Sequence, residues 1–207
     1  MFELFIRELQ RKSFHVSGSL IPIAYYFISR ETAIFFLAII NVILLFIEWQ
    51  RLSGRIKIPQ ILLRPHEKKQ VAAYIYFQIA AILSILLFEK TIAIAAILML
   101  ALGDTASGLA GAMQRGGNVR YSQNKIIIKP WPIMAIMFIV CLLIGLFLSD
   151  MPPAHDMVQM SFAVFVAGAV GATLGDAIPL RIQGKPVDDN LMIPLLAGLF
   201  MNVARLL

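Results

Sequence analysis

Long runs of apolar residues, separated by short segments that carry charges, dominate the pattern along the chain. A membrane-spanning helix needs about 20 mostly apolar residues. Seven runs approach this length and predict spans, and their bounds are Phe14 to Ile28, Thr32 to Trp49, Val71 to Phe88, Thr91 to Met113, Ile133 to Leu148, Met157 to Leu180 and Asn190 to Leu206. The pattern predicts an all-α fold, a polytopic transmembrane helical bundle in which residues 1–207 form a single integral membrane domain.

The positions of Lys and Arg predict the orientation of this bundle, because cytosolic loops carry an excess of both residues. With a cytosolic N-terminus, fifteen of the 18 basic residues fall in cytosolic segments, and only Arg30, Lys90 and Arg205 fall outside. Every loop between the predicted spans obeys the rule. We therefore predict a cytosolic N-terminus and a multi-pass protein, in a prokaryotic cell membrane rather than in the endoplasmic reticulum.

Composition agrees with a membrane protein, since 59% of the residues are hydrophobic and only 14% are charged. Soluble domains are typically about 45–50% apolar and about 25% charged. The net charge of +6 is largely explained by topology, so we expect membrane lipids as partners and no nucleic acid. Cys141 is the one cysteine, which excludes a disulfide within the chain.

Asp104 is the clearest ionisable residue inside a predicted span. It lies eleven residues before Arg115, or about 16 Å along a helix. Charged groups at such depth are costly and usually functional, so the carboxylate needs a partner, water or a metal. A purely structural role, in which Asp104 joins two helices by a hydrogen bond, is the alternative.

Asp176 repeats part of this pattern, because each of the two aspartates is the last residue of a Leu-Gly-Asp tripeptide. Its position closer to the cytosolic end also suits a simple interfacial aspartate. Small residues recur every four positions near both aspartates, a spacing that lets membrane helices approach closely. These rows are Gly103, Ser107 and Gly111 in one span, and Ala167, Gly171 and Gly175 in the other.

Two further groups of polar residues lie at predicted cytosolic span ends. Asp188, Asp189 and Asn190 open the last span, where they suit either helix capping or the binding of a hard cation. Glu8, Arg11, Lys12 and His15 follow helical spacing before the first span, where a basic interfacial anchor is the alternative reading.

Carboxylates, an amide and basic residues on one side of a membrane are the groups that phosphoryl transfer uses. No P-loop pattern and no protein-kinase signature occurs in the chain. The residues alone therefore indicate a membrane enzyme or transporter that handles a phosphorylated or cationic ligand.

Three segments resemble the CTP-dependent lipid alcohol kinases, a family that includes dolichol kinase, phytol and farnesol kinases and a yeast-type diacylglycerol kinase. The segments are Arg11-Lys12-xx-His15-xx-Gly18, Gly103-Asp104-Thr105-Ala106-xxxx-Gly111 and Asp188-Asp189-Asn190-Leu191-xx-Pro194-Leu195. Glu48 and the segment Arg64 to Glu67 also match the general pattern of the family.

The resemblance implies transfer of the CTP γ-phosphate to a membrane alcohol of the dolichol, phytol or geranylgeraniol type, with Mg²⁺ or another divalent cation as cofactor. It implies that CTP and a membrane lipid alcohol are the partners of the site. The implied site has three overlapping parts: Asp104, Asp176 and Lys129 for catalysis; Arg11, Lys12, His15, Lys125, Asp189 and Asn190 for the nucleotide; and Asp104, Asp188 and Asp189 for the metal.

One stretch departs from the family. Its members usually carry Lys-Ser-x-Glu-Gly-Ser/Thr after the basic loop, where this chain has Lys129-Pro130-Trp131-Pro132. Either Asp176 compensates for the missing Glu, or the nucleotide site differs, or catalysis is lost. A cytidylyltransferase that makes a CDP-activated lipid, a non-enzymatic transporter and a catalytically inactive relative therefore remain as alternatives.

Overall fold

The computed structural model describes residues 2–59, 63, 67, 69–114, 128–182 and 185–207. These residues form helices and one pair of two-residue strands. The elements are α1 (Phe2–Ser17), α2 (Leu20–Phe27), α3 (Arg30–Leu52), α4 (Ala73–Leu87), α5 (Lys90–Leu98), a π-helical segment (Met99–Gly103), α6 (Asp104–Met113), α7 (Trp131–Asp150), α8 (Phe162–Ala177), β1 (Arg181–Ile182), β2 (Lys185–Pro186) and α9 (Asp189–Leu206).

A helix lies at each predicted span, and the helical fold class is confirmed. Among the residues that the structure describes, three helices are long and apolar enough to cross a membrane: Arg30–Leu52, Trp131–Asp150, and Lys90–Met113, which joins α5, the π-helical segment and α6. The helices α4 and α8 are apolar but shorter. These findings support a membrane protein, while the count of seven spans and the cytosolic N-terminus stay predictions.

The first predicted span, Phe14 to Ile28, differs most from the structure. The chain is already helical from Phe2, and the helix breaks between Ser17 and Leu20. At this break Gly18 lies so close to Phe77 of α4 that a side chain there would collide with the ring. Hydropathy missed α1 because its charged residues lower the apolar average over most of its length.

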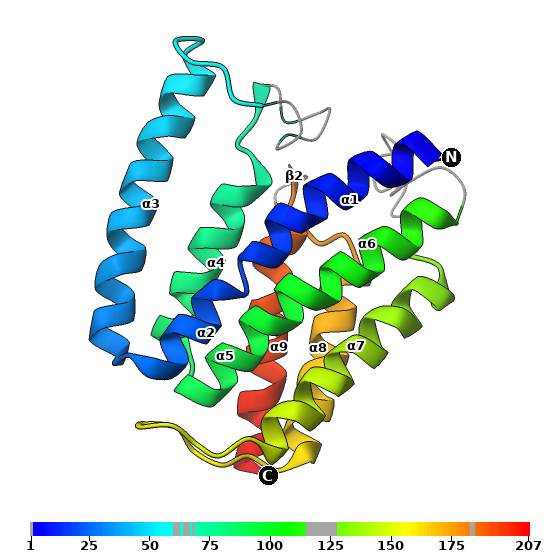
Figure 1. Ribbon diagram of the computed structural model, residues 1–207. Coiled ribbons are helices and arrows are strands. Elements are labelled where there is room, and N and C mark those ends of the chain that lie inside the picture. Colours follow the sequence, from blue (N-terminus) through cyan, green and yellow to red (C-terminus); the bar gives the residue numbers. More distant parts are fainter. Residues whose placement is uncertain (1, 60–62, 64–66, 68, 115–127, 183–184) are drawn as a thin grey trace.

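The helices run alternately up and down the bundle, and the α5–α6 helix lies at its centre beside α1, α2 and α7 (Figure 1). Of its apolar stretch, 72% is buried, whereas only 17% of the stretch in α3 is buried. Large apolar side chains on α3 are exposed instead, among them Phe35, Phe36, Val42, Ile43, Phe46 and Trp49. This exposed face is the kind of surface that lipid covers.

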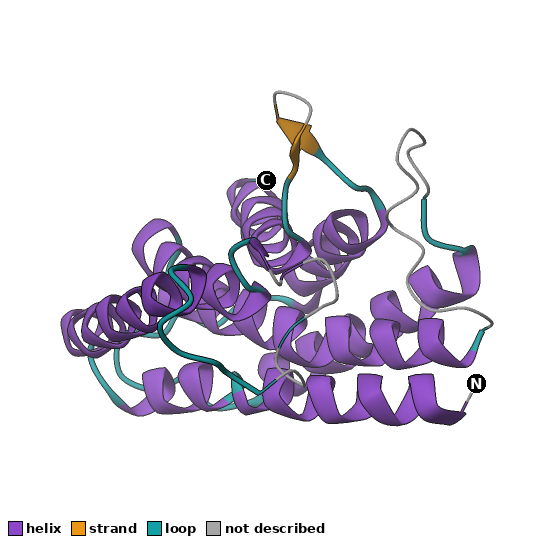
Figure 2. Cartoon of the chain, turned by 90° about the horizontal axis from the view of Figure 1, so that it is seen from above, coloured by secondary structure: helices purple, strands orange, loops and turns teal. Residues whose placement is uncertain are grey.

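Close contact between α8 and α9 explains one of the two small-residue rows. A Cβ added to Gly171 would lie 2.5 Å from the backbone oxygen of Leu196, and one added to Gly175 would lie 3.0 Å from the Cα of Ile193. The glycines thus let the two backbones approach. The short β1–β2 pair joins the end of α8 to the start of α9 (Figure 2). The packing of α8 on α9 therefore brings Asp176 close to Asp189.

The opposite end of the bundle is closed by polar contacts between loops. Lys90 Nζ donates to the backbone oxygens of Ile28 and His155, both at 2.9 Å. Glu89 caps α5 by accepting from the Thr91 amide at 3.0 Å, and Thr91 Oγ1 donates to the Val158 oxygen at 2.8 Å. These contacts hold the loops together at this end of the bundle.

Candidate functional site

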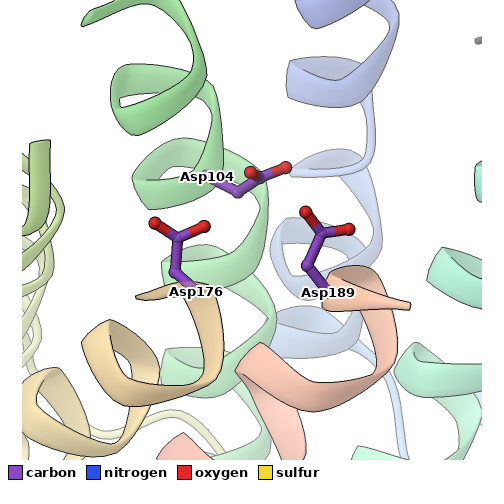
Figure 3. Close-up of side chains that lie close together, drawn as sticks. All are labelled: Asp104, Asp176 and Asp189. Atoms are coloured by element: carbon purple, nitrogen blue, oxygen red, sulfur yellow. The ribbon is translucent and has the colours of Figure 1, made fainter. Parts of the chain in front are cut away.

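Three buried carboxylates meet where α8 ends and α9 begins, beside the second half of α1. Asp104, Asp176 and Asp189 each offer an oxygen, and these oxygens lie within 4.8 Å of one another. Figure 3 shows the three carboxylates pointing toward a common space from α6, α8 and α9. The exposed fractions of the residues are 1%, 0% and 3%, so water does not screen their mutual repulsion.

Asp104 is the first residue of α6 and directly follows the π-helical segment. Lys12 Nζ donates to its Oδ2 at 2.5 Å, and His15 Nε2 lies 3.1 Å from the same oxygen without an aligned hydrogen bond. Lys12 is itself 1% exposed. Two of the three α1 residues expected to bind nucleotide, Lys12 and His15, therefore contact Asp104.

Gly108 makes room for this pair. It lies one turn after Asp104 on the same face of α6. A Cβ at this position would lie 2.5 Å from Lys12 Cε and 2.9 Å from Glu8 Oε1. The absent side chain at position 108 therefore lets α1 place the Lys12 ammonium on Asp104.

Asp176, in the last turn of α8, forms a second carboxylate–lysine pair. Lys129 Nζ donates to Asp176 Oδ1 at 2.6 Å and to Ser107 Oγ at 2.8 Å. Ser107 Oγ in turn donates to Asp176 Oδ2 at 2.7 Å. The three side chains, which are all buried, close a ring of hydrogen bonds.

The Lys129-Pro130-Trp131-Pro132 stretch starts α7. Pro130 occupies the N-cap position, and Pro132 lies in the first turn, where a missing backbone N–H costs nothing. The Lys129 amide also donates to the Ala177 oxygen at 3.3 Å. The departure from the family pattern thus keeps the lysine and places it against the end of α8.

Asp188 and Asp189 have different positions although they are adjacent. Asp188 is the N-cap of α9, and its Oδ1 accepts from the Asn190 amide at 3.0 Å and from Asn190 Nδ2 at 2.7 Å. Asp189, and not Asp188, has a carboxylate oxygen close to those of Asp104 and Asp176. Of the metal ligands expected from sequence, the structure therefore groups Asp104 and Asp189, with Asp176 as the third member and Asp188 as a helix cap.

Two buried oxygens at this site accept no hydrogen bond from the residues that the structure describes. They are Asp104 Oδ1 and Asn190 Oδ1. The orientation of the Asn190 amide follows from its Nδ2, which faces Asp188. A buried acceptor without a donor costs about 1–3 kcal/mol, so both oxygens are suited to an added ligand.

The remaining predicted nucleotide residues lie apart from the three aspartates or outside the described part of the chain. The Arg11 guanidinium pairs with Glu8 within α1, with Nη2 to Oε1 at 2.5 Å. Lys125 lies outside the described residues. Ser107, in contrast, belongs to the site, although the sequence pattern indicates only a small residue at a helix contact. Its position three residues after Asp104, on the same helical face, is the signal that could have found it.

Glu48 belongs to a second buried polar cluster, where α3 ends and α4 begins. Its Oε1 accepts from the Ala72 amide at 2.7 Å and from Arg51 Nη2 at 2.6 Å. Its Oε2 accepts from Tyr74 Oη at 2.6 Å and from Arg51 Nε at 2.7 Å. Arg51 also donates to the backbone oxygens of Glu67 and Gln70. We call Glu48, Arg51, Tyr74 and Ala72 the Glu48 cluster.

Comparison with known proteins does not place the chain in a family. No protein-family model, no curated protein and no solved structure matches it.

Proposed function

We propose that the protein is a CTP-dependent kinase that phosphorylates a membrane isoprenoid or polyprenol alcohol. The proposal is carried by the meeting of Asp104, Asp176 and Asp189 within 4.8 Å beside the buried lysines Lys12 and Lys129. Phosphoryl transfer uses carboxylates for a divalent cation and basic residues for phosphate charge. CTP as donor and a lipid alcohol as acceptor come from the resemblance of the three sequence segments.

A divalent cation fits the residues of this site. The donors are hard oxygen atoms, which Mg²⁺ prefers, and two of them are buried without a partner among the described residues. The three carboxylates also offer oxygens within 4.8 Å of one another, a spacing at which one cation can contact all three. Asp104, Asp189 and the Asn190 amide oxygen would hold the ion, which would neutralise phosphate oxygens when bound.

The two lysines are proposed to bind the phosphates. An ammonium group has three N–H donors, and Lys129 uses two of them for Asp176 and Ser107. The third can donate to a phosphate oxygen. Lys12, held on Asp104, brings a second positive charge to the same space, so charge that develops on the transferred group is stabilised from two sides.

In the proposed reaction the alcohol oxygen attacks the γ-phosphorus, the bond from this phosphorus to the β–γ bridging oxygen breaks, and CDP leaves. The hydroxyl proton passes to a carboxylate. Both oxygens of Asp176 already accept hydrogen bonds, whereas Asp104 Oδ1 accepts none from the described residues. This difference makes Asp176 the residue that holds Lys129 and Asp104 Oδ1 the oxygen open to the ion, and the proton acceptor is one of these two aspartates.

The membrane position of the helices suits a lipid substrate. The tail of the alcohol would stay in the bilayer beside exposed apolar surface such as that of α3, and its hydroxyl would reach the end of the bundle where the aspartates lie. CTP would arrive from the cytosol, in keeping with the predicted orientation.

A labelling experiment tests the proposal. Purified protein in lipid nanodiscs is incubated with γ-³²P-CTP, Mg²⁺ and either geranylgeraniol or a longer polyprenol. Label should enter the alcohol, EDTA should abolish the transfer, and Asp104→Asn should abolish it as well. The matched control is Asp150→Asn, which changes an aspartate at the far end of α7 and should leave the transfer unchanged.

Other labelling results would contradict the proposal. Label from α-³²P-CTP that enters a phospholipid would identify a cytidylyltransferase instead. Ion flux in proteoliposomes that is lost in Asp104→Asn, without any transfer, would identify a transporter. Failure to bind any nucleotide would identify a catalytically inactive relative.

A further inference from the structure

Ser107 occupies an unusual place in the ring that it forms with Lys129 and Asp176. Its hydroxyl accepts from the ammonium at 2.8 Å and donates to the carboxylate at 2.7 Å, so it uses both of its functions. The other buried serine of a described helix, Ser84 in α4, donates only to the Ala80 oxygen of its own helix at 2.8 Å. Ser107 instead links three separate parts of the chain.

Each of the two charged groups that Ser107 contacts lies at a helix end where the helix dipole disfavours its charge. Lys129 lies directly before the N-terminus of α7, where a positive charge is disfavoured. Asp176 lies in the last turn of α8, where a negative charge is disfavoured. The helix dipoles therefore explain the position of neither residue, whereas the two charges pair with each other and both contact Ser107.

We propose that Ser107 is a positioning residue that fixes the direction of the Lys129 ammonium, so that its remaining N–H can bind a phosphate of the donor. This inference rests on the proposed function, which it deepens. The hydrogen bond from Lys129 to Asp176 alone would leave the ammonium free to rotate about the Asp176 contact. The second bond, to Ser107, fixes two of the three donor directions and thereby sets the third.

The test compares phosphate binding by full-length variants in nanodiscs, with inorganic tripolyphosphate and Mg²⁺ as the probe in calorimetry and CTP as the substrate in kinetics. Ser107→Ala should weaken tripolyphosphate binding about tenfold, the loss expected for a hydrogen bond to a charged group. The KM for CTP should rise by a similar factor, while kcat changes much less. The control Ser84→Ala removes an equally buried hydroxyl and should change neither quantity.

A double mutant separates positioning from a structural role. In a Lys129→Ala background, Ser107→Ala should cause no further loss of tripolyphosphate affinity, because the residue through which it acts is gone. An equal loss in both backgrounds would overturn the proposal, as would wild-type affinity in the single Ser107→Ala variant. If Ser107→Ala does not fold, Ser107→Cys replaces it, since the thiol is similar in size and a weaker donor and should weaken binding by less than tenfold.

The outcomes also separate this inference from the proposed kinase. Weakened tripolyphosphate binding in Ser107→Ala, without transfer from CTP in the wild type, would support the positioning role and contradict the kinase. Transfer from CTP in the wild type, together with unchanged tripolyphosphate affinity in Ser107→Ala, would support the kinase and contradict the positioning role. Wild-type protein that does not bind tripolyphosphate at all would overturn the positioning role.

Discussion

The aspartate site and the Glu48 cluster are both buried and charged, but they differ in whether their hydrogen bonds are complete. Glu48 accepts two hydrogen bonds on each oxygen, and its charge is balanced by Arg51. At the aspartate site, two buried oxygens, Asp104 Oδ1 and Asn190 Oδ1, have no hydrogen-bond partner among the described residues. A complete cluster stabilises the fold, whereas an incomplete one is suited to bind something.

Breaking the Glu48 cluster should give the largest loss of stability. Glu48→Gln removes the carboxylate that makes two hydrogen bonds with the buried Arg51, and breaking a buried ion pair typically costs about 3–5 kcal/mol. Thermal unfolding in detergent should show a lower midpoint, while the folded fraction keeps its transfer activity. The double variant Glu48→Met/Arg51→Met removes both charges and should recover part of the loss. Loss of activity at full folding would remove the distinction between the two clusters.

At the aspartate site, Asp104→Asn should act on activity more than on stability. The cation that Asp104 would hold stabilises developing charge, and removing one such stabilising interaction typically lowers kcat by about 10²–10³, or about 2.7–4 kcal/mol. Because Lys12 would then be buried without its partner, the double variant Lys12→Met/Asp104→Asn controls for stability. It should unfold near the wild-type temperature and still be inactive. Transfer activity in a folded double variant would be incompatible with the proposed role.

Divalent cations should stabilise the protein through the aspartate site alone. A ligand present at 100 times its Kd stabilises the folded state by about 2.7 kcal/mol. The unfolding midpoint should therefore rise with added Mg²⁺ or Mn²⁺, and this rise should disappear in Asp189→Asn but persist in Glu48→Gln. An equal rise in all three proteins would mean that the cation binds elsewhere.

The smallest effect is expected for Gly108→Ala. The added methyl group would meet the flexible end of Lys12, which can shift, so the stability loss should be below that of Gly171→Ala. At Gly171 the methyl group would meet the backbone of α9, and overpacking of this kind costs about 1–3 kcal/mol. Transfer activity should fall more in Gly108→Ala than in Gly171→Ala. The opposite order would argue against a role for the Lys12 position.

Hydropathy predicted most of the helices because the length of an apolar run in the sequence is close to the length of the membrane helix that it forms. The predicted span Thr32 to Trp49 became α3, Arg30–Leu52, and the prediction Asn190 to Leu206 became α9, Asp189–Leu206. The prediction Met157 to Leu180 was too long, since α8 covers Phe162–Ala177. Residues 157–161 are apolar enough to extend the run, but they form the loop held by Thr91.

The site was predicted only in part, because spacing shows which residues share a helix face but not which helices meet. Asp104, Asp176 and Asp189 were each selected, and the structure groups them. That Asp188 caps the helix while Asp189 faces inward depends on the first turn of α9. The pairing of Lys12 with Asp104 spans 92 positions in the chain and could not be inferred from local pattern.

The π-helical segment Met99–Gly103 determines the direction, around the helix axis, in which the side chains of α6 point. A π segment amounts to one extra residue within an α-helix. If the same residues wound as a regular α-helix instead, every later residue would lie about one position further around the axis, and α6 would be rotated by about 100° relative to α5. Asp104 and Ser107 would then turn away from Lys12 and Asp176 together, although neither had been substituted. The two carboxylate–lysine pairs thus share one inserted residue as the common origin of their alignment.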